Sequence, residues 1–242
     1  MATSETHYKT LLGPIYSWML GDLDAAFARS AAEIEDLHLP VARGVAVDLG
    51  AGLGLHASAL AKRGFDVVAI DSCQALLDEL QSRLGSASIA SHQGDLREFR
   101  RFVSGQAQVI VCMGDTLTHL PALSTVESLL AEVAASLAPG GVFAATFRDY
   151  ATYALEGERR FILVRADADR IMTCFLEYEE HHVTVHDLLH EKEGGGWRQS
   201  ISSYPKLRLE PGWLMSTLSG LGFGVKRDTT PNGMVRIIAT KS

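Results

Sequence analysis

The chain has few cysteines and no long apolar run. Its 242 residues include three cysteines, Cys73, Cys112 and Cys174, and none of them forms a CxxC spacing. This scarcity argues against a disulfide framework and favours free thiols in a reducing compartment. No apolar run approaches the roughly 20 residues of a membrane-spanning helix, and the first residues lack the basic-then-apolar pattern of a signal peptide. We therefore expect a soluble, cytoplasmic protein with no membrane segment.

Basic residues are outnumbered as well. The 22 Lys and Arg residues against 29 Asp and Glu residues give a formal net charge of −7. Nucleic-acid surfaces need clustered cations to neutralise phosphates, so this balance argues against a nucleic-acid partner. Arg97, Arg100 and Arg101 form only a small cluster, which we interpret as a solvated helix face. The hydrophobic content of 47% is sufficient for a substantial core.

From residue 45 to residue 147 the sequence alternates between apolar strand patterns and amphipathic helix patterns. Alternation of this kind predicts a doubly wound α/β fold with a mainly parallel sheet. The strands are expected at 45–49, 65–70, 88–92, 107–113 and 142–147, and the helices at about 54–63, 73–84 and 122–137.

The two flanking regions show different patterns. Helical spacing over 5–38, divided by Pro14, predicts an N-terminal helical cap in two pieces. Residues 161–209 indicate antiparallel hairpins with hardly any helix. The hairpin strands are expected at 161–165, 171–179, 182–190 and 197–206, followed by a helix at 211–221 and a last hairpin of 223–227 and 234–240. We predict one domain over 1–242, with a cap at 1–40, a core at 41–150, a β insert at 151–210 and a closing helix and hairpin at 211–242.

The most informative segment is the apolar strand that ends in Asp48-Leu-Gly-Ala-Gly-Leu-Gly54. A glycine loop between a strand and a helix is typical of a nucleotide-type cofactor site. The dinucleotide fingerprint G-x-G-x-x-G would need glycine where Leu55 stands. The Asp48 carboxylate, at the end of the strand, is a poor neighbour for a diphosphate and a good one for a cationic ligand.

The spacing Asp-x-Gly-x-Gly-x-Gly resembles motif I of the class I S-adenosylmethionine-dependent methyltransferases. Asp71, at the end of the second strand, and the turn Leu137-Ala-Pro-Gly-Gly141 add to the resemblance, which covers about residues 45–150 and the last 30. It implies a Rossmann-like, mostly parallel seven-stranded sheet with an antiparallel last strand. It also implies S-adenosyl-L-methionine as cofactor and S-adenosyl-L-homocysteine as product.

The resemblance assigns cofactor contacts around the glycine loop. The backbone of Gly50, Ala51 and Gly52 passes under the methionine part of the cofactor, and Asp48 holds its ammonium directly or through water. Asp71 accepts hydrogen bonds from both ribose hydroxyls. An alternative role for Asp71, compatible with the first, is to cap the helix that begins near Ser72.

Further contacts follow from the next two strand ends and from the cap. Asp95 and Leu96 match the position that contacts the adenine, although Gly-Asp-Leu is also a common turn. The backbone of Met113 and Gly114 is expected to meet the cofactor at the end of the fourth strand. Because relatives often cover the site with such a cap, the aromatic side chains of its first piece are candidate contacts; packing inside the cap is the alternative. These side chains are Tyr8 and Tyr16.

His119 and Arg148 are the candidates for the chemistry. His119 follows the fourth strand and titrates near neutral pH, so it is a possible general base; hydrogen bonding to the cofactor carboxylate or to the loop is an equal alternative. Arg148, just past the fifth strand, is a candidate contact to a substrate carboxylate or phosphate, with a structural salt bridge as the alternative. The Asn/Asp-Pro-Pro-aromatic motif of amino-group methyltransferases that act on nucleic acids or proteins is absent from this loop.

Four histidines, at 181, 182, 186 and 190, resemble a metal site only at first sight. On a strand, residues four apart are separated by about 13 Å, too far for two imidazoles to share one zinc ion. Val183, Thr184 and Val185 favour a strand here. We predict no metal site and expect these histidines on a polar sheet face, over the substrate.

These observations lead to one preferred function and two rivals. The preferred prediction is methyl transfer to a nitrogen or oxygen of a small-molecule acceptor, with the β insert as a lid over the substrate or as a subunit contact in a homodimer. The rivals are an NAD-type oxidoreductase, disfavoured by Asp48 and Leu55, and a non-catalytic S-adenosylmethionine-binding protein. The sequence does not identify the acceptor.

Overall fold

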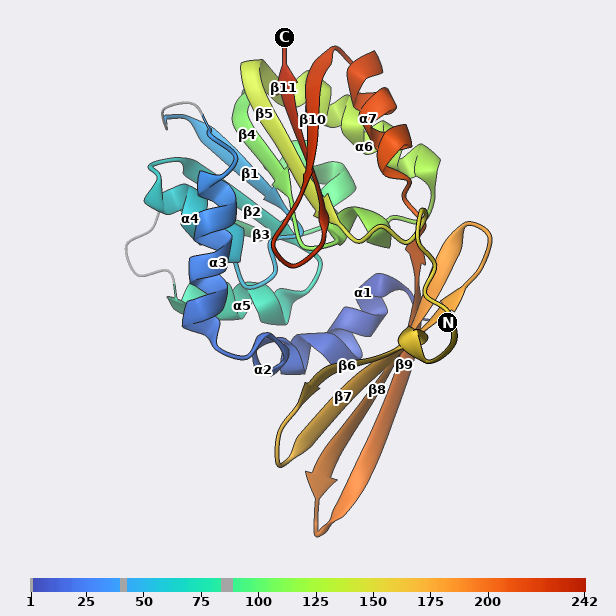
Figure 1. Cartoon of the computed structure of the whole chain (residues 1–242). Helices are drawn as coiled ribbons and strands as arrows, with labels where there is room; N and C mark the ends of the chain where they lie inside the picture. Colours follow the sequence, from blue (N-terminus) through green and yellow to red (C-terminus); the bar gives the residue numbers. More distant parts are fainter. Residues whose placement is uncertain (1, 40–42, 84–88) are drawn as a thin grey trace.

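A seven-stranded sheet forms the centre of the protein (Figure 1). The computed structural model describes residues 2–39, 43–83 and 89–242. The strand order is β10-β11-β5-β4-β1-β2-β3, and β11 alone among the sheet's strands runs antiparallel to its neighbours β5 and β10. The strands are β1 (Val45–Leu49), β2 (Asp66–Asp71), β3 (Ile89–Gln93), β4 (Ala107–Cys112), β5 (Leu137–Phe147), β10 (Phe223–Thr229) and β11 (Val235–Lys241). The predicted fold class is confirmed.

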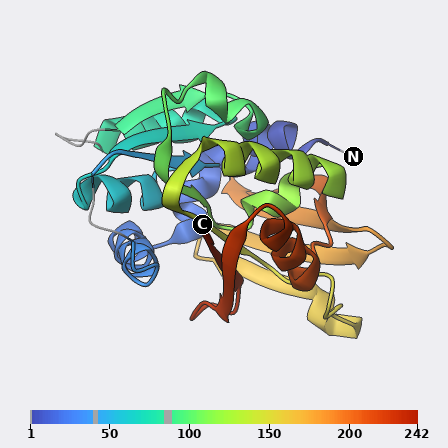
Figure 2. The same cartoon turned by 90° about the horizontal axis from the view of Figure 1, so that it is seen from above.

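Helices cover both faces of this sheet, which explains why its central strands are continuously apolar. One apolar cluster joins α3 (Leu23–Glu35), α4 (Leu55–Lys62) and α5 (Gln74–Arg83) to one face. The other cluster joins α6 (Leu123–Ser136), α7 (Pro211–Gly220) and the 3₁₀ helix Leu96–Arg101 to the opposite face. In the view from above, α3 and α7 lie on opposite sides of the strands (Figure 2). The predicted helix at 73–84 is confirmed to residue 83; residue 84 lies outside the described residues.

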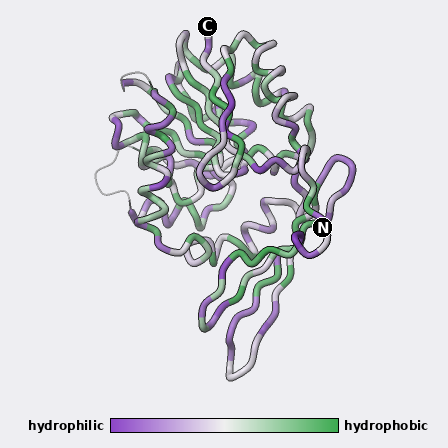
Figure 3. The backbone as a smooth tube through the Cα atoms, in the orientation of Figure 1, coloured by the Kyte–Doolittle hydropathy of each residue, from purple (hydrophilic) through white to green (hydrophobic). Residues whose placement is uncertain are grey.

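A second, antiparallel sheet extends from the first and consists of β6 to β9 in sequential order (Figure 1). The strands are β6 (Phe161–Ala166), β7 (Arg170–Tyr178), β8 (His182–Glu193) and β9 (Gly196–Leu207). The predicted hairpins are therefore confirmed. Hydrophobic colours run along the centre of the first sheet, whereas the turns of the second sheet are hydrophilic or neutral (Figure 3).

The N-terminal segment crosses the gap between the two sheets as a chain of short helices. These are α1 (Ser4–His7), a π turn (Tyr8–Leu12), a 3₁₀ turn (Gly13–Ile15) and α2 (Tyr16–Leu20). Pro14 lies in the 3₁₀ turn that separates the π turn from α2, and Ile15 has non-helical angles of φ −117° and ψ 3°. Gly13 itself keeps helical angles because it lacks the Cβ that would crowd the proline ring. A second turn of the chain follows at Gly21, whose φ is +82°.

The N-terminal segment is fastened to the second sheet by apolar and polar contacts. Leu11, Leu12 and Ile15 pack against Met172 and Leu189 in one buried cluster. This segment is thus held over the edge of the first sheet at which the parallel strands end. In the part of the chain that the structure describes, no helix combines the length and the apolar character needed to cross a membrane.

Candidate functional site

A cavity of about 860 Å³ lies at the carboxyl ends of β1, β2, β3 and β4, the edge at which open α/β sheets bind ligands. The structure brings together most of the predicted site residues on its wall. They are Tyr8, Tyr16, Gly50, Ala51, Gly52, Asp71, Ser72, Asp95, Leu96, Met113, Gly114 and His119. Asp48 and Arg148 are not among the lining residues.

The glycine loop is shaped by two close contacts and one open position. Gly50, Gly52 and Gly54 all have positive φ, of +77°, +53° and +75°. A Cβ on Gly54 would lie 1.8 Å from the Leu80 side chain, and a Cβ on Gly50 would lie 2.4 Å from the Thr116 side chain. At Gly52 the nearest protein atom to such a Cβ is 3.9 Å away. The loop therefore packs against protein at its ends and leaves its middle open toward the cavity.

Asp71 ties this loop to the end of β2. Its carboxylate accepts hydrogen bonds from the backbone N–H groups of Gly52 and Cys73, both at 2.8 Å. Burial raises the pKa of Asp71, and the backbone donors oppose that shift. The predicted capping role is present in the bond from Cys73. Because the carboxylate also lines the cavity, it remains available to a ligand, and the predicted ribose contact stays a prediction.

Asp48 lies within the sheet and is not among the residues that line the cavity, so the predicted contact with the ligand ammonium, direct or through water, stays a prediction. Asp48 is 1% exposed. One carboxylate oxygen has no hydrogen-bond partner among the described residues. Burial raises the pKa of Asp48 to about 6, and His56 and the Ala57 N–H oppose the rise. A strand of five residues buried on both faces leaves its polar side chain inside the packing.

The loop after β3 carries an acidic and a basic residue together. The Arg97 guanidinium donates two hydrogen bonds from Nε to the Asp95 carboxylate, at 2.7 and 2.9 Å. Hydrogen bonds from Arg97 lower the pKa of Asp95, although burial opposes the shift. Leu96 and Arg97 line the cavity beside it. This end thus offers a carboxylate and an apolar side chain, the pair predicted for the adenine.

His119, a candidate that the sequence predicted, lies at the other end of the cavity. It lines the cavity, and its ring lies parallel to Tyr204 at 5.5 Å and edge-on to Tyr8 at 5.6 Å. Burial, reinforced by the Lys206 cation, lowers the pKa of His119 to about 3. At neutral pH the imidazole is therefore uncharged, and it is a weak proton acceptor. Its Nδ1 is buried with no hydrogen-bond partner among the described residues.

Arg148 lies just past β5, as predicted, but it is not among the residues that line the cavity. Its backbone N–H donates a hydrogen bond to the Asp115 carboxylate at 2.9 Å, which fixes the chain just after β5. The residue is exposed and lies outside the residues that line the cavity. The structure therefore gives the backbone of Arg148 a role, and the predicted substrate contact of its side chain stays a prediction.

Several lining residues carry no sequence motif, and long-range packing brings them to the cavity. Arg29, Ser30 and Glu33 come from α3, and His56 from α4. His182, Pro205, Asn232 and Met234 come from the second sheet and from the final hairpin turn. The regular spacing of α3 predicts that Arg29 lies on a helix. It does not show whether the Arg29 side chain faces a cavity or solvent.

The four histidines of β8 and its preceding turn do not act together. His182 lines the cavity, as expected for a histidine over the substrate. His186 contacts Ser203 at 2.8 Å and Glu177 at 3.0 Å, and His190 contacts Gln199 at 3.0 Å. Among the described residues no group of three or more histidine, cysteine or carboxylate side chains is arranged to hold a metal ion.

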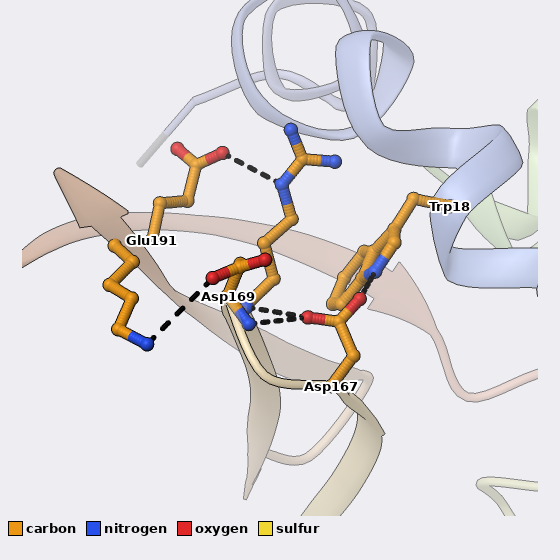
Figure 4. Close-up of a pocket in the computed structure, with 6 residues that line it drawn as sticks. Trp18, Asp167, Asp169 and Glu191 are labelled. Carbon is orange, nitrogen blue, oxygen red and sulfur yellow. Dashed lines mark hydrogen bonds and ion pairs between the residues drawn. The ribbon is translucent and has the colours of Figure 1, made fainter.

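A smaller pocket of about 310 Å³ lies where α2 meets the second sheet (Figure 4). The Trp18 indole N–H donates to the Asp167 carboxylate, which also accepts from the backbone N–H groups of Asp169 and Arg170. Arg170 pairs with Glu191 at 3.2 Å. Its polar groups are paired with one another, so we interpret it as the attachment of the N-terminal segment and place the chemistry in the larger cavity.

Residues 46–141 match the family model described as a methyltransferase domain. The glycine/sarcosine N-methyltransferase of Parasynechococcus marenigrum is 31% identical over 106 residues, which is 43% of this chain and 38% of that protein. The chain thus matches less than half the length of its curated relatives.

Two solved structures show the same fold over nearly the whole chain. DesVI from Streptomyces venezuelae has a TM-score of 0.78 at 20% identity, over 95% of this chain and 98% of that one. CalS10, an amino pentose methyltransferase from Micromonospora echinaspora, has a TM-score of 0.73 at 20% identity, over 90% and 91%.

The sheet order and the glycine-loop cavity define a class I methyltransferase fold. Residues 46–141 thus match a methyltransferase domain, and nearly the whole chain has the fold of solved methyltransferases.

Proposed function

We propose that this protein transfers a methyl group from S-adenosylmethionine to the nitrogen of a small-molecule amine. The observation that carries the proposal is the cavity itself. It is lined at one end by the open Gly52 position and the Asp71 carboxylate, and at the other by the neutral His119. Its volume falls within the range of about 300–1,000 Å³ that is typical of ligand sites.

The lining residues fit each part of the cofactor. Asp71 suits the ribose hydroxyls, and Asp95 with Leu96 suits the adenine. Arg29 supplies the cation that a methionine carboxylate requires. The bound cofactor supplies a methyl group on a cationic sulfur. The protein provides acidic side chains and no phosphate-binding helix end with G-x-G-x-x-G spacing, which favours this cofactor over NAD.

A nitrogen acceptor fits His119 better than an oxygen acceptor does. A hydroxyl must lose its proton to become a nucleophile, and a side chain with a pKa near 3 is a poor base at neutral pH. A neutral amine already has a free electron pair and needs only alignment. The curated relatives are named as N-methyltransferases, which supports the same choice.

The acceptor end favours an amine without a carboxylate. His119, His182, Asn232 and Met234 form its wall and bring no permanent cation. The buried Lys206 nearby is already bonded to Asp115. A glycine-like acceptor would need a cation for its carboxylate, whereas an amino sugar would need neutral hydrogen-bonding groups. CalS10, with a similar fold, is named an amino pentose methyltransferase.

Calorimetry with S-adenosylmethionine, S-adenosylhomocysteine and NADH tests the cofactor. We expect binding of the first two and none of the third. Binding of NADH alone would contradict the proposal. Methyl transfer from labelled cofactor to amino sugars, to glycine and to matched hydroxy sugars then tests the acceptor class. Cofactor binding without transfer to any acceptor would favour the non-catalytic alternative.

We also propose that a second copy of the chain covers the outer face of β6–β9. Phe161, Leu163 and Ile201 project from this face and are 65%, 63% and 60% exposed. Gathered apolar side chains on one face are typical of an association surface. Light scattering should give the mass of a dimer, and Ile201→Glu should give a monomer. A monomeric wild-type protein at micromolar concentration would exclude this assembly.

A further inference from the structure

The N-terminal segment is fixed to the second sheet by a fully buried histidine. His7, the last residue of α1, is 0% exposed. Because a carboxylate only accepts hydrogen bonds, its Nε2 donates to Asp187 on β8 at 2.9 Å, and its Nδ1 lies 2.7 Å from the Ser202 hydroxyl on β9. The ring stacks on Tyr204, with 4.1 Å between the ring centres. The second sheet therefore engages both nitrogens and one face of the imidazole.

The segment has little stability of its own. The helix α1 (Ser4–His7) has only four residues, and a π turn (Tyr8–Leu12) follows it. Isolated helices shorter than about 12–15 residues are marginal in water, and π turns are rare and often occur at functional sites. The apolar cluster between the segment and the second sheet adds attraction, which is non-directional. The two bonds of His7, in contrast, fix one orientation of the segment on the sheet.

The segment lies between the two sheets and closes the cavity on that side (Figure 1). Residues 2–20 contribute to the cavity wall along much of their length, through Thr3, Ser4, Glu5, Tyr8, Tyr16 and Leu20. Tyr8, the neighbour of His7 in the chain, lies edge-on to His119 with 5.6 Å between the ring centres. The position of His7 on the second sheet therefore determines where this part of the wall stands.

The segment also covers a cysteine. Cys73 is 5% exposed, is not among the residues that line the cavity, and packs in one apolar cluster with Tyr8 and Tyr16. A Cβ added to Gly13 would lie 2.9 Å from its Sγ atom. A reagent in solution therefore reaches the Cys73 thiol when the segment moves away, which makes this thiol a probe of the segment.

We propose that His7, Asp187 and Ser202 form a clasp that holds the N-terminal segment closed over the cavity, and that the cofactor and its product exchange when this clasp opens. His7 is a positioning residue here, because its contacts are made to the second sheet and it acts through the segment that carries Tyr8. The statement about exchange rests on the proposed function. The closure itself does not, since it concerns the protein without ligand.

The second sheet provides a matched control on its other face. His186 contacts the Ser203 hydroxyl at 2.8 Å and the Glu177 carboxylate at 3.0 Å, so it has the same kinds of partner as His7. It precedes Asp187 on β8, and successive side chains of a strand point to opposite faces of the sheet. The described partners of His186 all belong to the second sheet. Its removal thus deletes similar bonds without releasing the segment.

The first test measures alkylation of the ligand-free protein by iodoacetamide, quantified by mass spectrometry on the peptides that contain Cys73 and Cys112. Cys112, on β4, is 0% exposed and reports unfolding of the whole first sheet. His7→Ala should raise the labelling rate of Cys73 by about 10-fold or more, because the clasp includes a buried hydrogen bond to a carboxylate. The labelling rate of Cys112 should stay as in the wild type. His186→Ala should leave both rates unchanged.

The second test measures the dissociation of S-adenosylhomocysteine by stopped-flow displacement with excess S-adenosylmethionine. The dissociation rate should rise by about 10-fold or more in His7→Ala, in step with Cys73 labelling. His186→Ala should keep the wild-type rate. A His7→Ala protein with faster Cys73 labelling and unchanged dissociation would overturn the proposal that exchange requires the clasp to open.

Two labelling results would overturn the clasp itself. One is an unchanged Cys73 rate in folded His7→Ala. The other is an equal increase at Cys73 and Cys112, which would make His7 a general stabiliser of the fold. If His7→Ala does not fold, Ser202→Ala removes one hydrogen bond and leaves no charge without a partner; it must then raise Cys73 labelling alone, by about 3-fold or more. A protein that labels as expected but binds no S-adenosylhomocysteine would contradict only the proposed function.

Discussion

The two ends of the cavity are built in different ways. The end lined by Gly50, Gly52, Asp71 and Leu96 comes from successive strand-to-helix connections within a short stretch of chain. The end lined by Tyr8, His119, His182 and Asn232 is assembled from segments spread over nearly the whole sequence. The first end is held by backbone hydrogen bonds and glycine conformations, and the second by packing between the two sheets.

The first end is therefore fixed by the backbone of one continuous region, whereas the second depends on side chains from separate segments. The backbone of the glycine loop tolerates few changes because its φ values are positive and its ends touch Leu80 and Thr116. The acceptor end depends on side chains that any change of the second sheet would move. Substitutions at the two ends should therefore fail in different ways, which the following predictions examine.

The largest effect is expected for Gly54→Ala. The added methyl would lie 1.8 Å from the Leu80 side chain, at a φ of +75°. Overpacking and left-handed strain together should lower the free energy of unfolding by about 3 kcal/mol or more. Urea denaturation measures this free energy of unfolding. Gly114→Ala is the matched control, because it has a similar φ of +72° and no atom within 4 Å of the new Cβ; it should cost about 1–2 kcal/mol. Equal losses would show that strain alone decides.

His119→Gln should produce the next largest effect, at the acceptor end. We expect kcat/KM to fall by about 100-fold, since the variant disturbs the alignment of the acceptor. Cofactor affinity, measured by calorimetry, should be almost unchanged, and so should stability. A large loss of cofactor affinity would mean that His119 belongs to the cofactor end, as the alternative role at the cofactor carboxylate predicts.

The sequence predicted the two ends of the cavity to different extents. Gly52, Asp71 and Leu96 could be found because spacing along consecutive strands fixes where strand ends lie. For Asp48 and Arg148 the pattern locates each residue at a strand end without showing whether its side chain reaches the cavity, and neither is among the lining residues.

Apart from Tyr8, His119 and His182, the acceptor end could not be predicted, because no local pattern determines which turn meets which helix. Lys206 and Asp115 are far apart in the chain, and their bond exists only when the second sheet packs on the loop after β4. At Pro14 the helical type changes as expected, but Gly13 keeps helical angles because it has no Cβ to crowd the proline ring.

Asp71→Ala should weaken cofactor binding by about 1–3 kcal/mol, the cost of losing a buried charge-assisted hydrogen bond. It also removes the acceptor for the Gly52 and Cys73 N–H groups. Asp71→Asn, which keeps one oxygen acceptor, is the control and should retain part of the affinity. Calorimetry provides the measurement, and an unchanged affinity in Asp71→Ala would mean that the ribose lies elsewhere.

The last prediction concerns Asp48, beneath the cofactor end. Burial raises its pKa to about 6 from an ordinary value of 3.8. A carboxyl with a raised pKa binds its proton more tightly in the folded state. The Asp48 carboxyl therefore stabilises the folded state at low pH. This stabilisation is lost as the pH rises from the ordinary pKa of 3.8 through the raised pKa of about 6. In Asp48→Asn this contribution disappears, so the difference in unfolding free energy between about pH 4.5 and about pH 7.5 should change by about 1–3 kcal/mol relative to wild type.

Asp78→Asn, at an exposed position on α5, is the matched control and should leave that difference unaltered. If Asp48→Asn also leaves it unaltered, the carboxyl has an ordinary pKa and must find a cation or solvent in the folded state. Calorimetry on the same variant then separates two roles of Asp48. A loss of cofactor affinity without a change in the pH dependence of stability would place its carboxylate toward the ligand ammonium, as the resemblance to the methyltransferase motif predicted. A changed pH dependence with unchanged affinity would make it a buried residue of the sheet alone.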